Sequence, residues 1–326
     1  MILSPLSKIS QPIKSELEIF NGKFKDSMKS KVGLVDLIAR YIIRQKGKKI
    51  RPLLVLLSAK VTGGINERTY RGAVLVELLH TATLVHDDVV DNADKRRGLW
   101  SINALFKNKV AVLMGDYLLS RGLMIAVEGK DYDFLGVITE TVKRMSEGEL
   151  LQIQKTRKLD IDEPTYFQII SDKTASLLET CCKIGAMSAT ENTRYRDAMQ
   201  KFGKSIGIAF QIRDDILDFE GTSKTTGKPI GGDIQEKKLT LPLIYSLKQV
   251  SASEAAEIRK IIKNGRTKDG MQKIVEFIRR NNGIQYALDT ARKYSEEAKQ
   301  ALQILPESQS KIALEALVDF VIDRKN

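Results

Sequence analysis

The chain has 326 residues, of which 42% are hydrophobic and 29% charged, which predicts a globular protein with a sizeable core and excludes a disordered one. Lysine and arginine outnumber the acidic residues by 53 to 41, and the formal net charge of +12 fits nucleic acid, an anionic membrane surface or a phosphorylated small molecule as partner. No apolar run approaches the roughly 18 residues that span a bilayer, and residues 1–10 lack the features of a signal peptide, so we expect neither a transmembrane segment nor export.

Long stretches between the seven prolines show the 3.6-residue apolar repeat of helices rather than the alternation of strands. In chain order the repeat predicts helices near residues 8–28, 33–45, 51–61, 66–92, 101–127, 131–159, 163–190, 193–219, 239–249, 252–264, 268–281, 284–304 and 308–324. One helix start is marked by Asp162-Glu163-Pro164, because acids favour the N-terminal end of a helix and proline its first turn. The sequence carries neither strand signals nor a Pro- or Ser-rich linker, so we expect one all-α domain over residues 1–326.

The longest irregular stretch, residues 219–233, has several glycines but not the spacing of a phosphate-binding P-loop. Pro229 stands where that motif needs Ser or Thr, and we interpret the stretch as a lid between two helices. The two cysteines, Cys181 and Cys182, are adjacent, and neighbouring cysteines rarely meet disulfide geometry. Two adjacent cysteines without a disulfide predict a protein whose thiols are reduced, in the cytoplasm.

Two acidic motifs of the form DDxxD each follow an apolar helical run. The first comprises Asp87, Asp88 and Asp91, and the second Asp214, Asp215 and Asp218. The first and last residues of a motif share one helix face about 6 Å apart, and the second residue lies about 100° around the helix. Such oxygen-only pairs suit Mg²⁺, which favours one or two carboxylates plus substrate phosphates. The alternative is a solvated acidic helix end, which two copies followed by basic residues disfavour.

Basic residues surround these motifs in the sequence. They are Lys46, Lys48, Lys49 and Arg51 upstream, Lys95, Arg96 and Arg97 after the first motif, and Lys224, Lys228, Lys237 and Lys238 after the second. Arginine grips phosphate oxygens with two parallel hydrogen bonds, and lysine acts as a point charge. His80 falls on the helix face of Asp87, where it can donate to a second anion. Together these residues predict that the protein binds a diphosphate, whose negative charge is balanced by the metal ion and by lysine and arginine side chains.

Five blocks of the sequence resemble those of a known protein family. The blocks GKKIRP (47–52), HTATLVHDDVVDNADKRRG (80–98), KTASL (173–177), FQIRDDILDF (210–219) and GKPIGGDIQEKKLTLP (227–242) are similar to those of the trans-isoprenyl diphosphate synthases, or polyprenyl synthetases, of long-chain type. They occur in family order and span most of the chain. The resemblance implies a single all-α bundle of the isoprenoid synthase type, with the aspartate motifs on two facing helices. It also implies a homodimer, head-to-tail chain elongation and about three Mg²⁺ ions per active site.

The resemblance also assigns roles to individual residues. It implies that Asp87, Asp91 and Asp214 bind Mg²⁺, that Asp88, Asp215 and Asp218 support that cluster, and that Lys173 acts at the catalytic centre. The allylic substrate would contact Arg96, Lys173, Thr174, Gln211, Lys228 and Lys238, and isopentenyl diphosphate would contact Lys48, Arg51, His80 and Arg97. Two departures from the family pattern affect fine geometry: Lys46 and Lys49 replace a glycine and an arginine, and Glu236 stands where glycine is common.

Three small or apolar positions below the first motif bear on product length. Ala82 and Thr83 lie where bulky aromatics close the tunnel in short-chain members, so the chain is expected to grow past Leu79. We therefore expect a hexaprenyl to nonaprenyl product, octaprenyl above all, made from farnesyl or geranylgeranyl diphosphate for a quinone side chain. The alternative is that Ala82 and Thr83 only pack a neighbouring helix, with Met114 or Leu118 as the floor and a shorter product.

Other classes of protein explain the sequence less well. A class I terpene cyclase has a different second metal motif and does not need the GKKIRP and RRG blocks. A basic nucleic-acid binder accounts for the +12 charge but not for paired acid clusters, which repel phosphates. A non-catalytic subunit is disfavoured because both motifs are complete. We therefore expect no nucleic-acid partner, and only a peripheral membrane contact during product release.

Overall fold

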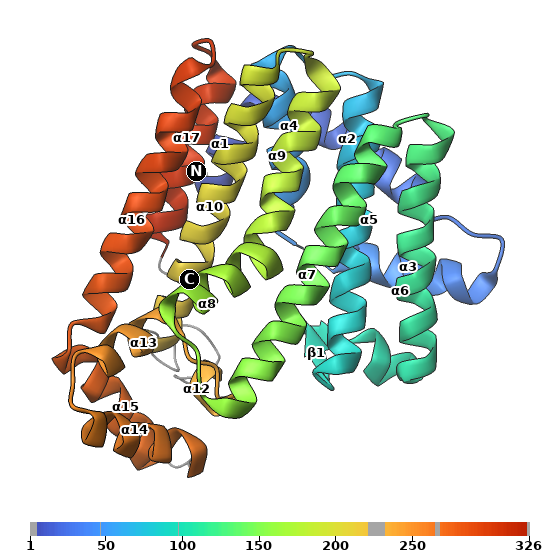
Figure 1. Ribbon diagram of the computed structural model, residues 1–326. Helices are drawn as coiled ribbons and strands as arrows, with labels where there is room; N and C mark the ends of the chain where they lie inside the picture. The colour runs from blue at the N-terminus through green and yellow to red at the C-terminus, as the bar shows by residue number, and fades with distance from the viewer. Residues whose placement is uncertain (1–4, 46, 97, 221–231, 265–267, 325–326) are drawn as a thin grey trace. The chain divides into compact units, whose positions relative to one another are not determined.

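The computed structural model describes residues 5–45, 47–96, 98–220, 232–264 and 268–324. Figure 1 shows a chain made almost entirely of helices, so the predicted all-α fold class is confirmed. The N-terminal elements are α1 (Pro5–Ile9), η1 (Gln11–Ile13), α2 (Lys14–Ser27), α3 (Gly33–Arg44), α4 (Ile50–Thr62), α5 (Glu67–Val90), α6 (Ile102–Glu128) and α7 (Tyr132–Lys158). The later ones are α8 (Glu163–Ile170), η2 (Ser171–Ala175), α9 (Ser176–Ala189), α10 (Thr193–Glu220), α12 (Gly232–Gln235), α13 (Leu241–Lys248), α14 (Ala252–Asn264), α15 (Lys268–Arg280), α16 (Gly283–Ala301), η3 (Leu302–Ile304) and α17 (Gln309–Asp323).

Helix boundaries follow from local sequence signals. At the start of α5, the side chain of Asn66 accepts a hydrogen bond from the backbone N–H of Thr69, and the Thr69 hydroxyl accepts one from the backbone N–H of Asn66 in return. Asp162 caps α8 in a similar way by accepting from the N–H of Thr165, which confirms the predicted helix start there. The predicted helix at 163–190 is divided, because a π-helix, η2, separates α8 from α9.

The expectation that the chain has no strands is wrong at one place. Strands β1 (Lys95–Arg96) and β2 (Leu99–Trp100) pair antiparallel, with Lys95 opposite Trp100 and Arg96 opposite Leu99. Each strand is two residues long, which is too short for an alternating pattern to be recognised in the sequence. Gly98 has a φ of +79°, a conformation that glycine adopts without steric cost, and it permits the tight turn between them.

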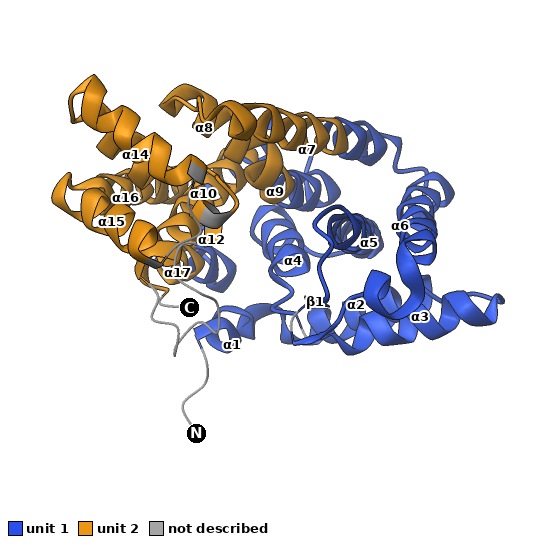
Figure 2. Cartoon of the chain, turned by 90° about the horizontal axis from the view of Figure 1, so that it is seen from below, with its two compact units in different colours: residues 1–140, 180–199, 304–314 blue, residues 141–179, 200–303, 315–326 orange. Residues whose placement is uncertain are grey.

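The chain divides into two compact units, coloured separately in Figure 2. Unit 1 comprises residues 1–140, 180–199 and 304–314, and unit 2 comprises residues 141–179, 200–303 and 315–326. The chain passes between the units within α7, α9, α10, η3 and α17. A single domain over residues 1–326 stays a prediction.

Unit 1 is organised around α5, which packs against α2, α4 and α6. Two glycines of α6 allow the close approach to α5. A Cβ atom at Gly115 would collide with the imidazole ring of His86, and one at Gly122 would lie 3.2 Å from Cδ1 of Leu75. The core of this unit includes the fully buried Leu54, Leu56, Leu57 and Leu78. This packing fixes the helix that carries the first aspartate motif.

Unit 2 has a hydrophobic cluster of its own. Its members include Ile212 and Ile216 of α10, Leu241 and Leu243 of α13, Ile274 and Ile278 of α15, and Ala287 and Ala291 of α16. The apolar face of α10 is thereby turned into the core. The second aspartate motif lies at the end of α10, so the same packing sets its orientation.

By length and composition, α6 is the one helix in the described part of the chain that is long and apolar enough to cross a membrane. Core helices of water-soluble proteins meet the same criteria, and only a third of its apolar window is buried within the structure. The helix carries Asp116 and Arg121 near its middle. Charges at those positions are costly in a bilayer, so α6 is weak support for a span.

Candidate active site

The first aspartate motif places its carboxylates in two different environments at the end of α5. Asp87 and Asp91, one turn apart, are exposed. Asp88 is only 3% exposed, and its Oδ1 accepts a 2.5 Å hydrogen bond from Nε of Arg96. Because an uncompensated buried carboxylate costs several kcal/mol, Arg96 supplies the countercharge that lets Asp88 be buried. The two carboxylates predicted to bind metal are therefore the ones that remain accessible.

A pocket in unit 1, called here the unit 1 pocket, lies beside this motif and brings several predicted substrate residues together. It holds about 970 Å³ of empty space, part of it open to solvent, and its lining includes His80, Asp88 and Arg96. His80 is buried, with 7% of its surface exposed. Lys49 also lines the pocket; partial desolvation lowers the pKa of its amine, an effect that the Glu77 carboxylate opposes. The pocket thus combines cations with a buried imidazole, as an anion site requires.

Not every residue predicted to bind isopentenyl diphosphate belongs to this lining. Lys48 is exposed and Arg51 lies in the first turn of α4, and neither of these two described residues lines the unit 1 pocket. Arg97 lies outside the described residues.

The three positions predicted to set product length belong to the packed part of α5. Ala82 and Leu79 are each 2% exposed, and the Thr83 hydroxyl donates to the carbonyl of His80 at 2.9 Å. None of these three described residues lines the unit 1 pocket. On α6, Met114 and Leu118 are buried as well. Both interpretations of the tunnel floor therefore remain predictions.

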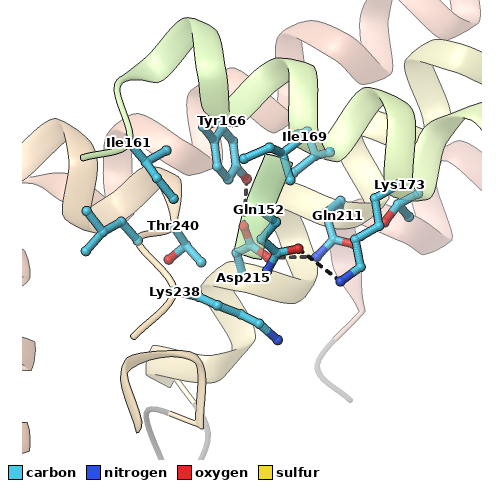
Figure 3. Close-up of a pocket in the computed structure, with 12 residues that line it drawn as sticks. Gln152, Ile161, Tyr166, Ile169, Lys173, Gln211, Asp215, Lys238 and Thr240 are labelled. Carbon is cyan, nitrogen blue, oxygen red and sulfur yellow. Dashed lines mark hydrogen bonds between the residues drawn. The ribbon is translucent and has the colours of Figure 1, made fainter. Parts of the chain in front are cut away.

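The second motif is built into a hydrogen-bond network that Figure 3 shows in close-up. Asp215, 4% exposed, accepts bonds from the Tyr166 hydroxyl at 2.6 Å and from Nε2 of Gln211 at 2.8 Å. The Thr174 hydroxyl in turn donates to Oε1 of Gln211 at 2.9 Å. The hydrogen bonds from Thr174 to Gln211 and from Gln211 to Asp215 connect three predicted site residues that belong to two separate sequence blocks.

The other two carboxylates of this motif are more accessible. Asp214 is 43% exposed at its side chain and forms an ion pair with Arg324, near the C-terminus. Asp218 is half-buried and accepts a 3.0 Å hydrogen bond from the N–H of Gly232. Burial and the neighbouring Arg213 lower the pKa of Arg324 to about 10. Arg324 thus holds the position of a countercharge beside a predicted metal ligand.

A pocket in unit 2, the unit 2 pocket, surrounds this network and holds about 540 Å³ of empty space, part of it open to solvent. Its polar lining includes five predicted site residues: Lys173, Thr174, Gln211, Asp215 and Lys238. In Figure 3, Lys173, Gln211 and Asp215 gather together while Lys238 extends below them in the view. Apolar residues such as Ile161 and Ile169 complete the lining.

Both lysines of this pocket are held by carboxylates. Lys173 donates to Oε1 of Gln152 at 2.9 Å and pairs with Glu149, and Lys238 pairs with Glu236 at 2.5 Å. Glu236 is one of the residues that depart from the family pattern, so this departure affects a predicted substrate lysine directly. Lys228, predicted for the same substrate, lies outside the described residues, as does most of the expected lid at 219–233.

The sequence alone did not indicate four of these participants: Tyr166, Gln152, Glu149 and Arg324. They belong to no recognised block, and 49 residues separate Tyr166 from the carboxylate that it contacts. Only the fold brings them to the motif. A polar side chain in an apolar helical run, as at Tyr166, was the one available signal, and it is equally typical of a tyrosine at a core boundary.

The donor set of the motifs fits magnesium. Among the described residues, no three His, Cys, Asp or Glu side chains gather into a metal site. Mg²⁺ does not need such a cage, because it takes one or two carboxylates and completes its shell with water and substrate phosphate. The accessible oxygen ligands at Asp87 and Asp91, and at Asp214, match this requirement.

Comparison with known proteins decides the family. The family model described as "Polyprenyl synthetase" matches residues 33–278. The chain belongs to the polyprenyl synthetase family. It is 32% identical to the octaprenyl diphosphate synthase of Haemophilus influenzae over 324 residues, which cover 99% of this chain and 98% of that one. Shorter-chain members also match, among them a geranylgeranyl diphosphate synthase of Saccharolobus solfataricus at 33% identity over 94% of this chain and 95% of that one.

Solved structures of polyprenyl synthetases have the same fold. A decaprenyl diphosphate synthase from Rhodobacter capsulatus matches with a TM-score of 0.92 and 29% identity, covering 98% of this chain and 99% of that one. A polyprenyl synthase from Caulobacter crescentus, complexed with calcium and isoprenyl diphosphate, matches with a TM-score of 0.90 and 32% identity, covering 98% of both chains. These structures confirm the all-α isoprenoid synthase fold.

Proposed function

We propose that the protein is a Mg²⁺-dependent trans-prenyltransferase that elongates an allylic diphosphate with isopentenyl diphosphate, head to tail, to a long-chain polyprenyl diphosphate. The observation that carries the proposal is the Thr174–Gln211–Asp215 network. It connects three residues from sequence blocks typical of the family, and all three line the unit 2 pocket together with two lysines. In the first motif, the buried Asp88 accepts a corresponding hydrogen bond from the half-buried Arg96.

The predicted functional residues of the two units divide into metal ligands, cations and supports. Asp87, Asp91 and Asp214 would hold Mg²⁺, which when bound neutralises the diphosphate and so weakens its bond to the allylic carbon. Lys173 and Lys238 balance the remaining charge as the diphosphate leaves. The supports are Asp88 with Arg96 in unit 1, and Asp215 with Tyr166 and Gln211 in unit 2. Asp218 assists the second motif, and Thr174 orients Gln211.

The reaction needs no side-chain nucleophile. The bond between the allylic C1 and the diphosphate oxygen breaks, and the double bond of isopentenyl diphosphate supplies the electrons for the new carbon–carbon bond. A proton then leaves the adjacent carbon, with the released diphosphate as acceptor. The chain's contribution is to hold both substrates and exclude water. The unit 1 pocket, with His80 and Arg96, is suited to isopentenyl diphosphate, with Lys48, Arg51 and Arg97 as further predicted contacts.

The long product is supported by small residues below the first motif. Ala82 is buried and leaves no aromatic floor at its position on α5, and relatives that share nearly the whole chain include octaprenyl and nonaprenyl diphosphate synthases. We therefore propose a hexaprenyl to nonaprenyl product, octaprenyl above all, for a quinone side chain. Farnesyl or geranylgeranyl diphosphate would be the starter. A shorter product is the second candidate, favoured by the burial of Met114 and Leu118 on α6.

The proposal extends to the assembly and location of the protein. Apolar side chains of α6 that are exposed in the single chain include Leu105, Val112, Leu113, Met124 and Val127. A second copy covering them would make a homodimer. Cys181 and Cys182 are buried thiols that form no disulfide, and burial, reinforced by Cys182, raises the pKa of the Cys181 thiol, which keeps it unreactive. This fits the reducing cytoplasm, with membrane contact only at product release.

The test is incubation with isopentenyl diphosphate and either farnesyl or geranylgeranyl diphosphate in the presence of Mg²⁺, followed by chromatography of the dephosphorylated products. We expect polyprenols of six or more isoprene units. A product that stops at geranylgeranyl would refute the long-chain part and leave the enzyme class standing. No elongated product with either starter would refute the enzyme class.

Substitution in each motif completes this test. Asp87→Ala and Asp214→Ala should each lower turnover by orders of magnitude, and for Asp87→Ala the melting temperature should stay near that of the wild type. Asp289→Ala is the matched control, because this carboxylate pairs with Arg292 in an exposed ion pair and lines neither the unit 1 nor the unit 2 pocket. Wild-type turnover in either motif variant would refute the proposal that these aspartates bind Mg²⁺.

A further inference from the structure

The π-helix η2 presents two substrate-pocket residues side by side. Ser171–Ala175 forms one wide turn between α8 and α9, closed by a hydrogen bond from the N–H of Ser176 to the carbonyl of Ser171. Lys173 and Thr174 sit in this turn, and both line the unit 2 pocket. A π-turn is less favourable than an α-helical one and is retained mainly where it serves a function. The structure must therefore contain contacts that hold it.

Two glycines let neighbouring helices pack directly onto the turn. A Cβ atom at Gly148 of α7 would lie 3.0 Å from the backbone nitrogen of Lys173 and 3.1 Å from Cβ of Asp172. A Cβ atom at Gly207 of α10 would lie 2.6 Å from Cα of Ala175. Real Cβ atoms do not approach a backbone atom as closely as that last distance. Both sides of the turn are thus in contact with backbone rather than with adjustable side chains.

Arg144 of α7 bridges the two ends of the turn. Its guanidinium donates to Oδ1 of Asp172 at 2.9 Å, to Oε2 of Glu179 at 3.1 Å and to the Ser171 hydroxyl at 3.3 Å. Gln200 fixes the other oxygen of Glu179 with a 2.6 Å bond. One planar cation therefore spans from the start of η2 to the first turn of α9. The rigid fork of an arginine suits this role, whereas a lysine provides a single point charge.

These contacts are well shielded. The side chains of Asp172 and Glu179 are 21% and 10% exposed, and that of Arg144 is 26% exposed. Burial opposes the charge of Arg144, but the hydrogen bonds to Asp172 and Glu179 outweigh it and raise the pKa of the guanidinium. None of these three described residues lines the unit 2 pocket. The contacts of Arg144 with Asp172 and Ser171 link it to the pocket through η2.

We propose that Arg144 is a positioning residue that holds the π-turn in register, so that Lys173 and Thr174 both face the pocket. The role rests on the proposed prenyltransferase function, because it concerns the residues that bind the allylic diphosphate. Without Arg144, η2 can relax toward the α-helical pairing of its neighbours, which turns Lys173 away from its present position. The expected result is weaker binding of the allylic diphosphate with isopentenyl diphosphate binding preserved.

The first experiment compares Arg144→Met with Arg71→Met. Arg71 forms a similar half-buried pair with Asp131 in unit 1, at 2.6 and 3.1 Å, and lines neither the unit 1 nor the unit 2 pocket. We expect Arg144→Met to raise KM for the allylic substrate and lower kcat/KM by about 10- to 100-fold, because small displacements of a substrate-positioning group have effects of that size. KM for isopentenyl diphosphate should change less than about twofold. Equal effects of the two variants, or equal changes in both KM values, would overturn the proposal.

A double-mutant cycle shows whether Arg144 acts through the turn. If it does, Arg144→Met should add little to the effect of Lys173→Met, since the group that it positions is already removed. Independent, multiplicative losses would overturn the proposal. Arg144→Lys should recover part of the loss, because it restores one charged contact with Asp172 but not the bridge to Glu179 and Ser171.

Two further measurements keep the proposal testable if Arg144→Met folds poorly. Gly148→Ala pushes on the backbone of Lys173 while favouring the helix in which it lies, so it should raise the allylic KM without lowering the melting temperature. Calorimetric titration with inorganic diphosphate and Mg²⁺ measures binding independently of turnover, and we expect at least about a fivefold loss of affinity in either variant. Unchanged diphosphate affinity in both variants would refute the positioning role. A wild-type protein that binds diphosphate but elongates nothing would instead refute the proposed function.

Discussion

Replacing Tyr166 with phenylalanine removes one hydroxyl from the unit 2 pocket and leaves the ring and its packing in place. That hydroxyl donates to Oδ2 of Asp215 at 2.6 Å, and Asp215 is 4% exposed. A hydrogen bond to a charged group contributes about 1.5–3 kcal/mol, which corresponds to roughly a 10- to 150-fold change in an equilibrium or rate constant. Asp215 keeps its bond from Gln211, so we expect a loss of kcat/KM near the lower end of this range.

The assay is steady-state elongation with each substrate varied in turn, together with a thermal melt. Tyr286→Phe is the matched control, because the Tyr286 hydroxyl also donates to a carboxylate, Oε1 of Glu163 at 2.5 Å, but lines neither the unit 1 nor the unit 2 pocket. Tyr166→Phe should reduce activity by about tenfold or more, whereas the control should keep wild-type kinetics. If the two variants had the same kcat/KM, the idea that Tyr166 orients the second aspartate motif would be wrong.

Three further predictions concern residues outside that network. Glu236→Gly removes the carboxylate that pairs with Lys238; because the glutamate is mostly exposed, stability should hardly change, and KM for the allylic diphosphate should fall by up to about fivefold in the same kinetic assay. Ala82→Tyr fills a buried position on α5, so product chromatography should show shorter polyprenols, and an unchanged length distribution would disprove the tunnel assignment. Burial and the Glu163 carboxylate raise the pKa of Tyr286 to about 12, so the folded state keeps this proton while the unfolded chain loses it. Stability should therefore fall as pH rises from about 10 to 12, and melts of Tyr286→Phe should show less of that fall.

Much of the fold was predictable because helix formation here depends on local signals. The apolar repeat located α3, α5 and α10 to within one or two residues of their observed ends. The errors occur where structure depends on only a few residues. The π-turn η2 interrupts a continuous helical pattern, and Gly148 of α7 and Gly207 of α10, which pack closely against it, lie outside that stretch of sequence.

The site was predictable only in part, for a related reason. Motif residues such as Asp88 and Asp215 were found because their type and spacing suit metal and diphosphate chemistry. Their partners were not all found, because a tyrosine or an arginine outside a motif becomes a partner only through the packing of distant helices. Arg324 is the clearest case, since it lies near the C-terminus, far in the sequence from Asp214, with which it forms an ion pair. The substrate contacts that the family resemblance implies for Arg97 and Lys228 stay predictions.

The two aspartate motifs follow one structural rule that explains why the pattern needs its second aspartate. In each motif that residue is buried and bonded within its own unit, Asp88 to Arg96 and Asp215 to Tyr166 and Gln211. A helix turns about 100° per residue, so fixing the second position also sets the directions in which the first and fifth point. The buried carboxylate thus sets the rotation of the helix end, and the accessible ones are left to bind metal. Replacing the second aspartate should therefore disturb metal binding through geometry, although that carboxylate itself need not contact the ion.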